Sequence, residues 1–513
     1  MKLRDTQFGF DLVLDNPFRI FRYLREVAIE SVGEENIIDL SRGDPGYGFS
    51  PSVGGREFYS FLLMIDAMLN RPGEHFVTNN RDSHEILWKK IEERANTVYR
   101  KDTAERLLGM LRTFLNKVEK IAAMQGLSWD RRKILFEMFK YSAVSGGQYH
   151  DPQGEILTRL IVSNHHNETF GLGITHRDLV CIRGVSDGIG TLFKLLCSDE
   201  VGFLQKGDAV LITSPVYAPY NTIMKNRGLE VYSVSVNPTT GKVNGSLSEM
   251  LANAPKNVKA ICIIDPNNPT GFLFEENFLK EIAEFAKKRD ALIIADEVYG
   301  DFFPGKKKNM MTYAPKRTIT MLGRSKIERS TGLRFAEYIV SQEADAYISR
   351  EILKGRLNGN PDLKSLLIAG KAPGGINGEF QHTTFVAGPS QFLGISHILF
   401  GESDRKDYVE RVQKNMEEFY EGIGLPYLGN FYYATFDLLN VTLSRACHDS
   451  PESLFLGLAK KGVVLIPANL FFSDSERALG DYRTFARASL ANLNMEQVQR
   501  GAFLIKEILA FLK

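Results

Sequence analysis

The chain has 513 residues, of which 43% are hydrophobic and 24% are charged, so it can bury a large core and is expected to form two or more domains. Its 63 basic and 62 acidic residues give a formal net charge of +1, which excludes a global field that would attract nucleic acid or an anionic membrane. Four widely spaced cysteines without a CxxC pair predict neither a metal site nor a redox site, and the lack of a secretory signal or a membrane-length apolar run predicts a cytoplasmic protein.

The first 142 residues are expected to form an N-terminal segment and a helical insertion. We expect residues 1–50 to form an N-terminal segment that packs with a small C-terminal domain. Residues 51–142 are rich in helix formers and predict a helical insertion, because apolar residues recur there at helical spacing: Leu107, Leu108, Leu111, Phe114, Leu115 and Val118.

Residues 143–395 predict a large α/β domain. Apolar strand-like runs alternate with amphipathic stretches, which indicates a largely parallel sheet covered by helices; the runs are 179–182, 209–213, 231–236, 260–264, 291–295 and 318–322. Ligands bind beyond the carboxyl ends of such strands, and clusters of Gly, Asp and Asn follow these runs. Residues 396–513 predict a smaller α+β domain with strand-like runs at 432–438 and 463–466 and a final helix from Met495. A glycine-bearing stretch, 370–378, has no assigned role.

Three motifs follow predicted strands in order. Asp265-Pro-Asn-Asn-Pro-Thr-Gly271 alone is as typical of a tight turn as of a binding site. Asp296-Glu-Val-Tyr299 ends the next strand, and Gly323-Arg-Ser-Lys326 ends another, with Arg334 eight residues after the lysine. In combination they resemble the class I/II aminotransferases of pyridoxal-5'-phosphate (PLP) fold type I, which carry NPTG, D-x-x-Y and S-x-S-K followed by arginine. Gly323 stands where that family usually has serine.

The resemblance implies PLP as the cofactor. It also implies an α/β fold, with a mostly parallel seven-stranded sheet that has helices on both faces. It implies that Lys326 holds PLP as a Schiff base and moves the proton at the substrate Cα. Asp296 would pair with the pyridine nitrogen, and Asn268 and Tyr299 would bind the 3'-oxygen, with Asn268 also near the substrate. Tyr217 would stack on the ring. The alternatives are a helix N-cap for Asp296 and a core position for Tyr217.

The cofactor phosphate needs donors of hydrogen bonds. The resemblance assigns it to the start of the helix that follows strand 179–182, where backbone N–H groups are free: Gly184, Val185 and Ser186. Ser325 and Arg334 would add a hydroxyl and a bidentate cation. Tyr149 resembles the family's tyrosine that reaches the phosphate of the neighbouring subunit, which implies a homodimer with shared active sites; a surface tyrosine is the alternative.

Two further segments suggest the substrate. Arg487, in Arg487-Ala-Ser-Leu-Ala-Asn-Leu-Asn494, matches the arginine that grips the α-carboxylate, a role that suits a bidentate guanidinium. Arg42 and Gly43, in Ser41-Arg-Gly-Asp-Pro45, would lie near the distal part of the substrate; a solvated loop arginine is the alternative. These segments and Gln381-His-Thr383 resemble the aspartate 4-decarboxylase/aspartate aminotransferase branch. Phe21 stands where that branch has lysine, which argues against aspartate itself.

Three functions follow from the sequence. The first is an aminotransferase of aspartate-aminotransferase type, with an α-amino acid and a 2-oxo acid as substrates. The second is a PLP-dependent lyase, decarboxylase or C–C bond-forming enzyme on the same frame, since the fold does not choose the bond that is broken. The third is a non-catalytic regulator with a degenerate domain, which is disfavoured because the motif residues are retained and no basic DNA-binding module precedes them.

Overall fold

The structure is a computed structural model that describes residues 10–12, 17–45, 53–69, 82–141, 150–198, 202–303, 305–355, 386–441, 450–480 and 482–511. Tyr149, residues 370–378 and Gln381-His-Thr383 lie outside these ranges. The chain forms two compact units, each built from separate segments. Unit 1 comprises Met1–Phe49, Leu204–Phe302 and Tyr408–Lys513, and unit 2 comprises Ser50–Phe203 and Phe303–Asp407.

Seven strands belong to the main sheet. Unit 1 contributes four parallel strands in the spatial order β6-β5-β3-β4: β3 (Ala209–Ser214), β4 (Glu230–Ser235), β5 (Val258–Ile264) and β6 (Leu292–Asp296). Unit 2 contributes three strands in the order β2-β8-β7, in which β8 is antiparallel to both neighbours: β2 (Leu179–Ile182), β7 (Thr318–Gly323) and β8 (Ala336–Val340). The predicted α/β fold with a mostly parallel seven-stranded sheet is confirmed, and each of the six predicted runs forms a strand.

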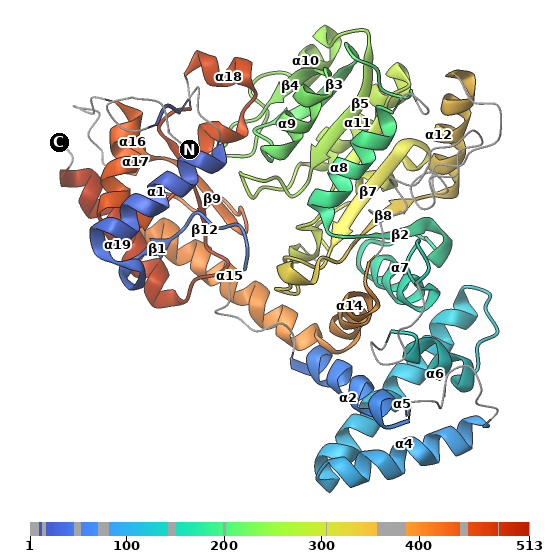
Figure 1. The fold of residues 1–513 in the computed structure, drawn as a ribbon. Coiled ribbons are helices and arrows are strands. Elements are labelled where there is room, and N and C mark those ends of the chain that lie inside the picture. The colour runs from blue at the N-terminus through green and yellow to red at the C-terminus, as the bar shows by residue number, and fades with distance from the viewer. Residues whose placement is uncertain are drawn as a thin grey trace. The chain divides into compact units, whose positions relative to one another are not determined.

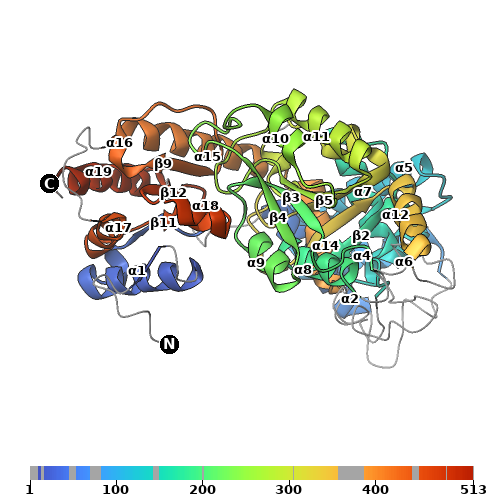
Figure 2. The same ribbon diagram turned by 90° about the horizontal axis from the view of Figure 1, so that it is seen from above.

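In unit 1, helices cover both faces of the parallel strands (Figures 1 and 2). Helices α10 (Leu247–Asn253) and α11 (Glu276–Arg289) lie on one side of β3 and β5, and α9 (Pro219–Asn226) lies on the other. The strands therefore bury both faces, and every residue of β3 and β6 is buried. This explains why their sequences are continuous apolar runs rather than alternating ones.

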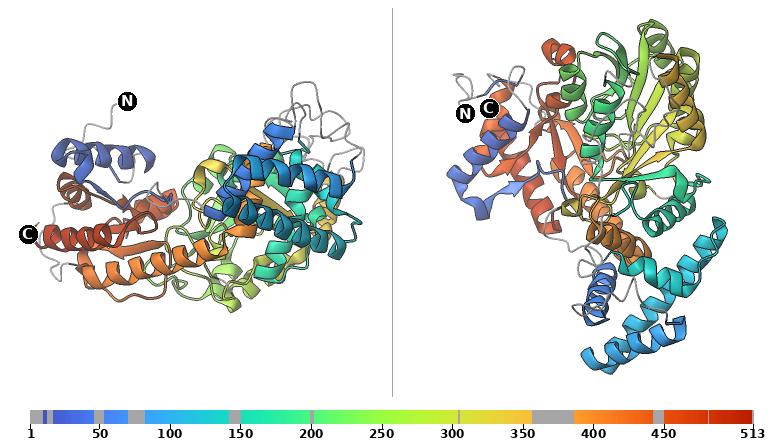
Figure 3. Two further views of the ribbon diagram at one scale, coloured as in Figure 1. Left: turned by 90° about the horizontal axis from the view of Figure 1, so that it is seen from below. Right: turned by 45° about the vertical axis from the view of Figure 1, so that its right-hand side comes forward.

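The N-terminal segment in unit 1 contacts the C-terminal elements. It consists of α1 (Pro17–Val32), η1 (Glu34–Asn36) and β1 (Ile38–Asp39). The C-terminal elements are α15 (Glu402–Ile423, from Tyr408 onward), β9 (Tyr433–Asp437), α16 (Leu438–Val441), α17 (Pro451–Lys460), β10 (Val463–Val464), β11 (Ile466–Pro467), η7 (Ala468–Phe471), α18 (Asp474–Leu479), β12 (Phe485–Ser489) and α19 (Met495–Phe511). Helix α17 packs against both α1 and α19, which are far apart in sequence (Figure 3).

One strand prediction needs correction. The run 463–466 is not a single strand but two short ones: β10 pairs in parallel with β1, whereas β11 pairs with β12 in a separate antiparallel sheet of order β11-β12-β9. Leu465, which is buried, separates them. An apolar run indicates that a strand is buried, but it does not indicate which strand is its hydrogen-bonding partner. The sequence therefore could not show that the chain passes from one sheet to another here.

All described elements of unit 2 within residues 51–142 are helices: α2 (Val53–Leu69), α4 (His84–Val98), α5 (Lys101–Met124) and α6 (Arg131–Phe139). The apolar residues predicted from helical spacing in α5 are all buried. They share a core with α7 (Ile156–Phe170) and α14 (Gly388–Phe400). Unit 2 also contains η2 (His176–Asp178), α8 (Val185–Leu196), η4 (Met310–Thr312), η5 (Pro315–Arg317), η6 (Thr331–Leu333) and α12 (Gln342–Gly355). None of the helices in the described ranges combines the length and apolar character needed to cross a bilayer. The domain boundaries 1–50, 51–142, 143–395 and 396–513 stay predictions.

His397, where α14 packs on α2, makes the stability of the fold depend on pH. A Cβ on Gly55 of α2 would lie 2.3 Å from the His397 ring, so the helices touch there. His397 is fully buried, and neither ring nitrogen has a hydrogen-bond partner among the described residues. Burial, and next the positive charge of Arg405, lowers the pKa of His397 to about 4.

We expect the fold to lose stability as the pH falls from about 6.5 to about 4. The unfolded chain, in which a histidine has a pKa near 6.5, binds a proton across this window whereas folded His397 does not. The difference of roughly 2.5 pKa units corresponds to about 3 kcal/mol. In a His397→Leu variant, urea unfolding at pH 7, 5 and 4 should show a pH dependence smaller by about this amount. The same dependence in both proteins would contradict the assignment.

Candidate active site

In unit 1, the carboxyl ends of β5 and β6 carry two of the predicted site residues. Asp296 ends β6, is 3% exposed and accepts a hydrogen bond from the Tyr220 hydroxyl at 3.3 Å. It is not the N-cap of a helix, since residues 297–299 are not helical and the next element, the short 3-10 helix η3 (Gly300–Phe302), begins only at Gly300. Asn268 lies in the loop after β5 and is 5% exposed, and its Oδ1 has no hydrogen-bond partner among the described residues. Buried acceptors are normally satisfied, so Asn268 is suited to receive a ligand's donor.

Arg487 is a buried cation in the middle of β12. It is 4% exposed, and its guanidinium carbon lies 4.4 Å from the centre of the Tyr433 ring. One guanidinium nitrogen donates to the carbonyl of Ser41, but Nε has no partner and no carboxylate of the described residues forms an ion pair with Arg487. A buried charge without a counter-ion is costly, so this position favours an anionic ligand.

Tyr433, at the start of β9, connects Arg487 with two other predicted site residues. Its hydroxyl is 2.6 Å from that of Tyr299, and burial raises the pKa of both tyrosines. A Cβ on Gly43 would lie only 2.7 Å from the Tyr433 hydroxyl, so this approach requires glycine. Unit 1 thus brings Tyr299, Gly43 and Arg487 around one tyrosine. Sequence reasoning missed Tyr433 because a tyrosine in a predicted strand looks like a core residue.

Two other predicted residues of unit 1 take less constrained positions. Arg42 is exposed, and its Nε lies 3.3 Å from a carboxylate oxygen of Asp44. Tyr217 is half-buried after β3, and its carbonyl accepts the N–H of Tyr220 at 3.0 Å. Tyr220, whose hydroxyl reaches Asp296, was also missed from the sequence. Tyr217 therefore lies on the same short segment as the tyrosine that contacts Asp296.

In unit 2, four of the predicted phosphate-binding residues, Gly184, Val185, Ser186 and Arg334, lie at the start of α8. Gly184 is the N-cap of α8 with φ of 81°, followed by Val185 and Ser186, which is exposed. A Cβ on Gly184 would lie 2.6 Å from Nη2 of Arg334, which donates to the Arg183 carbonyl at 3.1 Å. A guanidinium and the N–H groups of the first turn of a helix therefore lie together, an arrangement that attracts anions.

Lys326 and Ser325 lie in the turn that follows β7 in unit 2. Lys326 is half-buried and Ser325 is 8% exposed. The turn is closed by two backbone hydrogen bonds, from Arg329 N–H to the Lys326 carbonyl at 3.1 Å and from Ser330 N–H to the Ser325 carbonyl at 3.2 Å. Lys326 is thus presented from an ordered turn at the carboxyl end of a strand, as the sequence predicted.

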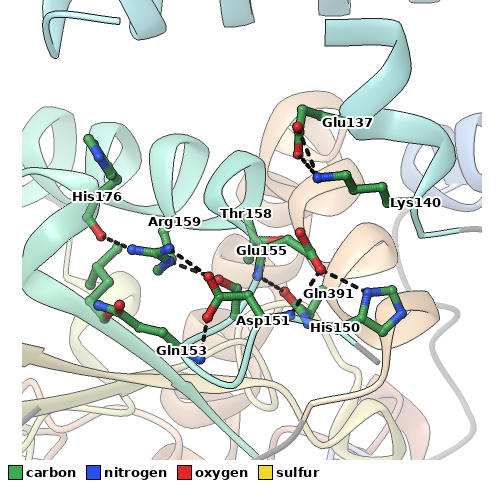
Figure 4. Close-up of polar contacts among 12 residues, drawn as sticks. Glu137, Lys140, His150, Asp151, Gln153, Glu155, Thr158, Arg159, His176 and Gln391 are labelled. Carbon is green, nitrogen blue, oxygen red and sulfur yellow. Dashed lines mark hydrogen bonds and ion pairs between the residues drawn. The ribbon is translucent and has the colours of Figure 1, made fainter. Parts of the chain in front are cut away.

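The chain directly after Tyr149 is held by a polar network around the buried Glu155 in unit 2 (Figure 4). The Glu155 carboxylate lies 3.0 Å from Nδ1 of His150 and accepts the N–H of Asp151 at 3.1 Å, while the Glu155 N–H donates to Oε1 of Gln391 at 2.9 Å. Burial raises the pKa of Glu155, but the hydrogen bonds from His150 and the Asp151 N–H outweigh it and hold that pKa below its usual value. These contacts tie the loop to α7 and α14.

We expect Gly184→Ala to weaken anion binding in unit 2. The added methyl meets the Arg334 guanidinium, and the positive φ of Gly184 is unfavourable for alanine by about 1–2 kcal/mol. The dissociation constant for inorganic phosphate, measured by calorimetry, should rise about tenfold. Gly190→Ala is the matched control, because nothing lies within 4 Å of a Cβ there. Equal phosphate affinities in both variants would show that Gly184 and Arg334 do not form the anion site.

A family model and the curated relatives all point to the same family, the aminotransferases. A model described as aminotransferase class I and II matches residues 145–503. The chain is 27% identical over 356 residues to a Pseudomonas sp. protein named bifunctional aspartate aminotransferase and L-aspartate beta-decarboxylase, with 62% of this chain and 64% of the relative covered. It is 27% identical over 188 residues to the aspartate/prephenate aminotransferase of Thermus thermophilus, with 36% and 47% covered. The chain thus spans about half to two thirds of the length of these relatives.

Solved structures show the same fold at low sequence identity. The N-succinyldiaminopimelate aminotransferase from Mycobacterium tuberculosis has a TM-score of 0.61 at 14% identity, covering 97% of this chain and 98% of that one. The alanine aminotransferase from Pyrococcus furiosus has a TM-score of 0.57 at 17% identity, covering 77% and 87%. At these identities the likeness concerns the fold alone, and it agrees with the α/β architecture described above.

Proposed function

Because the chain belongs to the aminotransferase class I and II family, a family of fold type I enzymes, we propose that it is a PLP-dependent aminotransferase that transfers the amino group of an α-amino acid to a 2-oxo acid. The family and fold predicted from the sequence motifs are thereby confirmed. The observation that carries the proposed activity is Arg487, a buried guanidinium without a carboxylate partner among the described residues, next to Tyr433 and Tyr299.

The described residues fit PLP. Asn268 offers a buried acceptor without a partner, and Gly184 leaves space beside Arg334 that a side chain would fill. We propose that Gly184, Val185, Ser186, Ser325 and Arg334 bind the phosphate, that Asp296 accepts a hydrogen bond from the protonated pyridine nitrogen, that Asn268 and Tyr299 bind the 3'-oxygen, and that Tyr217 stacks on the ring. PLP, when bound, supplies the electron sink that makes proton removal from Cα feasible.

The protein's own groups would then act on the substrate. Lys326 would bind the cofactor covalently and afterwards move the proton at the substrate Cα, a role that needs an amine free to change protonation. Arg487 would orient the substrate by binding its α-carboxylate through two parallel hydrogen bonds. Arg42 is the candidate residue for binding the second carboxylate of a dicarboxylic amino acid. That carboxylate would compete with Asp44 for the Arg42 guanidinium.

We further propose a cytoplasmic homodimer. The support is the family resemblance of the segment around Tyr149, whose tyrosine would reach the phosphate bound by the partner subunit, and the network in Figure 4 that holds the chain after it. Light scattering after size exclusion tests the dimer. Mixing Tyr149→Phe and Lys326→Ala chains then tests shared sites, because only in a dimer with shared sites would one of the two sites regain both side chains and exceed the activity of either variant alone.

A lyase or decarboxylase is the second candidate. It is favoured by the name of the Pseudomonas relative, which includes aspartate beta-decarboxylation. The experiment that separates the two incubates the PLP-loaded protein with aspartate, glutamate, alanine and other amino acids, with and without 2-oxoglutarate. Glutamate that forms only with the 2-oxo acid supports the aminotransferase. Carbon dioxide or ammonia released without an acceptor supports the lyase.

A further inference from the structure

Two ion pairs, one fully buried and one with a buried carboxylate, lie on either side of Lys326 in unit 2. Two residues before it, Arg324 is fully buried, and its Nη2 lies 3.4 Å from a carboxylate oxygen of Glu337, which is also fully buried. Two residues after it, Glu328 is 1% exposed and accepts a hydrogen bond from Nη1 of Arg405 at 2.8 Å. The turn that carries Lys326 is thus anchored at both ends by buried charged side chains, Arg324 and Glu328.

The first pair connects the turn to β8 and α7. Glu337 lies opposite Leu322 in the β7–β8 ladder, so its side chain shares a face with that of Arg324, two residues further along. The same carboxylate oxygen of Glu337 lies 2.7 Å from Nε2 of His166, which is fully buried on α7. Arg324 Nη1 lies 3.1 Å from Nε2 of the adjacent His165. Contacts with β8 and α7 therefore fix the orientation of the Arg324 side chain.

The second pair connects the turn to the end of α14. Arg405, in the first part of α15, also donates to the carbonyls of His397 at 2.6 Å and Ile398 at 3.2 Å, near the C-terminus of α14. A cation at a helix C-terminus is favourable in itself, so Arg405 is held independently of the turn. Glu328 thus binds to a partner that is already in place.

The turn also closes on the backbone of Arg324. The Arg324 carbonyl accepts the N–H of Glu328 at 3.1 Å and the hydroxyl of Ser330 at 3.2 Å. The Arg324 N–H donates to the carbonyl of Phe335 on the neighbouring segment at 3.3 Å. A shift of Arg324 would therefore move the whole turn, including Lys326.

Stability alone does not explain these charges. Replacing a buried ion pair with apolar residues of similar size is often neutral or stabilising, because the charges no longer have to leave water. Accurate placement is a different requirement, since a displacement of about 1 Å of a reacting group can reduce the rate about 100-fold. Groups that fix a catalytic residue are accordingly held by a supporting shell of packed and hydrogen-bonded neighbours.

We propose that Arg324–Glu337 and Glu328–Arg405 are positioning pairs, which hold the turn of Lys326 so that its amine meets the cofactor and the substrate Cα. The inference rests on the proposed role of Lys326. It assigns function to residues that do not touch substrate, and it explains why a charged side chain is buried two positions before the lysine.

Two variants test the proposal. Arg324→Met with Glu337→Met removes the first pair without leaving one charge buried alone, and Glu328→Gln weakens the second pair with an isosteric side chain. We expect kcat to fall about 10- to 100-fold in each, with KM for the amino acid changed by less than about threefold. The pH at which the visible absorbance of the PLP-loaded protein changes should shift. In the cofactor-free protein, the amides of residues 324–330 should exchange with deuterium faster.

Glu137→Gln is the matched control for a buried ion pair elsewhere in unit 2. Glu137 on α6 is 2% exposed and pairs with Lys133 at 2.6 Å and with Lys140 at 2.9 Å. Figure 4 shows the contact with Lys140. Its loss should lower the thermal midpoint while kcat, the spectral pH transition and exchange in residues 324–330 stay at wild-type values. This separates a general loss of stability from a displaced Lys326.

Wild-type kcat, spectral transition and amide exchange in Glu328→Gln would overturn the proposal, whether or not the double variant folds. A double variant that folds and keeps all three wild-type values would overturn it for the first pair. Failure of the proposed function has a different signature, because the wild-type protein would then show no visible absorbance with PLP, while deuterium exchange in the cofactor-free variants would still report on the turn.

Discussion

Lys326→Ala is expected to reduce kcat/KM by at least about 10³-fold and to abolish the visible absorbance of the PLP-loaded protein. The loss combines the covalent attachment of the cofactor with general acid–base catalysis, which alone contributes about 10²- to 10⁴-fold. Lys326 lies half-buried in a hydrogen-bonded turn after β7, so the substitution removes an amine and leaves the turn's backbone contacts in place. Folding should be retained, which circular dichroism checks.

Lys316→Ala is the matched control, since Lys316 is an exposed lysine of unit 2 in η5. Borohydride reduction of the PLP-loaded protein, followed by peptide mapping, should place the cofactor on the peptide that contains Lys326. Small primary amines added to Lys326→Ala should restore part of the activity, because they supply the missing base. Label on another lysine, or full activity in Lys326→Ala, would refute the assignment.

The main strands could be read from the sequence because they are buried on both faces. Residues 209–213 and 260–264 are the predicted apolar runs, every residue in them is buried, and they lie within β3 and β5. Strand β8 was not among the predicted runs. Its second residue is Glu337, and a carboxylate argues against a buried strand unless its partners, Arg324 and His166, are known.

The residues of the candidate site could be named from motifs, but their mutual contacts could not. Local patterns gave Asp296 at a strand end and Gly184 at a helix start, because strand ends and N-caps depend on neighbouring residues. The bond from Arg487 to the Ser41 carbonyl joins residues 446 positions apart, and the Tyr299–Tyr433 contact joins residues 134 apart. Such contacts depend on the tertiary fold, and no periodicity in a single sequence reports them.

Arg487→Met is expected to impair recognition of the substrate α-carboxylate specifically. Removing one partner of a buried, hydrogen-bonded charge pair costs about 2–5 kcal/mol, which corresponds to a loss of roughly 30- to several thousand-fold in kcat/KM for the amino acid. Arg487→Lys should recover only part of this, because an ammonium keeps the charge but cannot form two parallel hydrogen bonds. Amine substrates that lack a carboxylate should react equally well with wild type and Arg487→Met.

The stability of the protein without ligand distinguishes substrate binding from a structural role for Arg487. A structural arginine would be paired, and its loss would destabilise the fold strongly. Arg487 instead lies against the rings of Tyr433 and Phe471, and none of the described carboxylates forms an ion pair with it, so its removal also removes the cost of an uncompensated buried charge. The thermal midpoint of the ligand-free variant should therefore stay close to that of wild type.

A carboxylate ligand should separate the thermal midpoints of wild type and Arg487→Met, which are expected to be similar without ligand. A dicarboxylate such as maleate, added to the PLP-loaded protein, is expected to raise the thermal midpoint of wild type, because a ligand that binds only the folded state stabilises it by mass action. Arg487→Met should show little increase at the same concentration. Equal stabilisation of both proteins would place the carboxylate elsewhere, whereas strong destabilisation of the ligand-free variant would make Arg487 a residue of the fold.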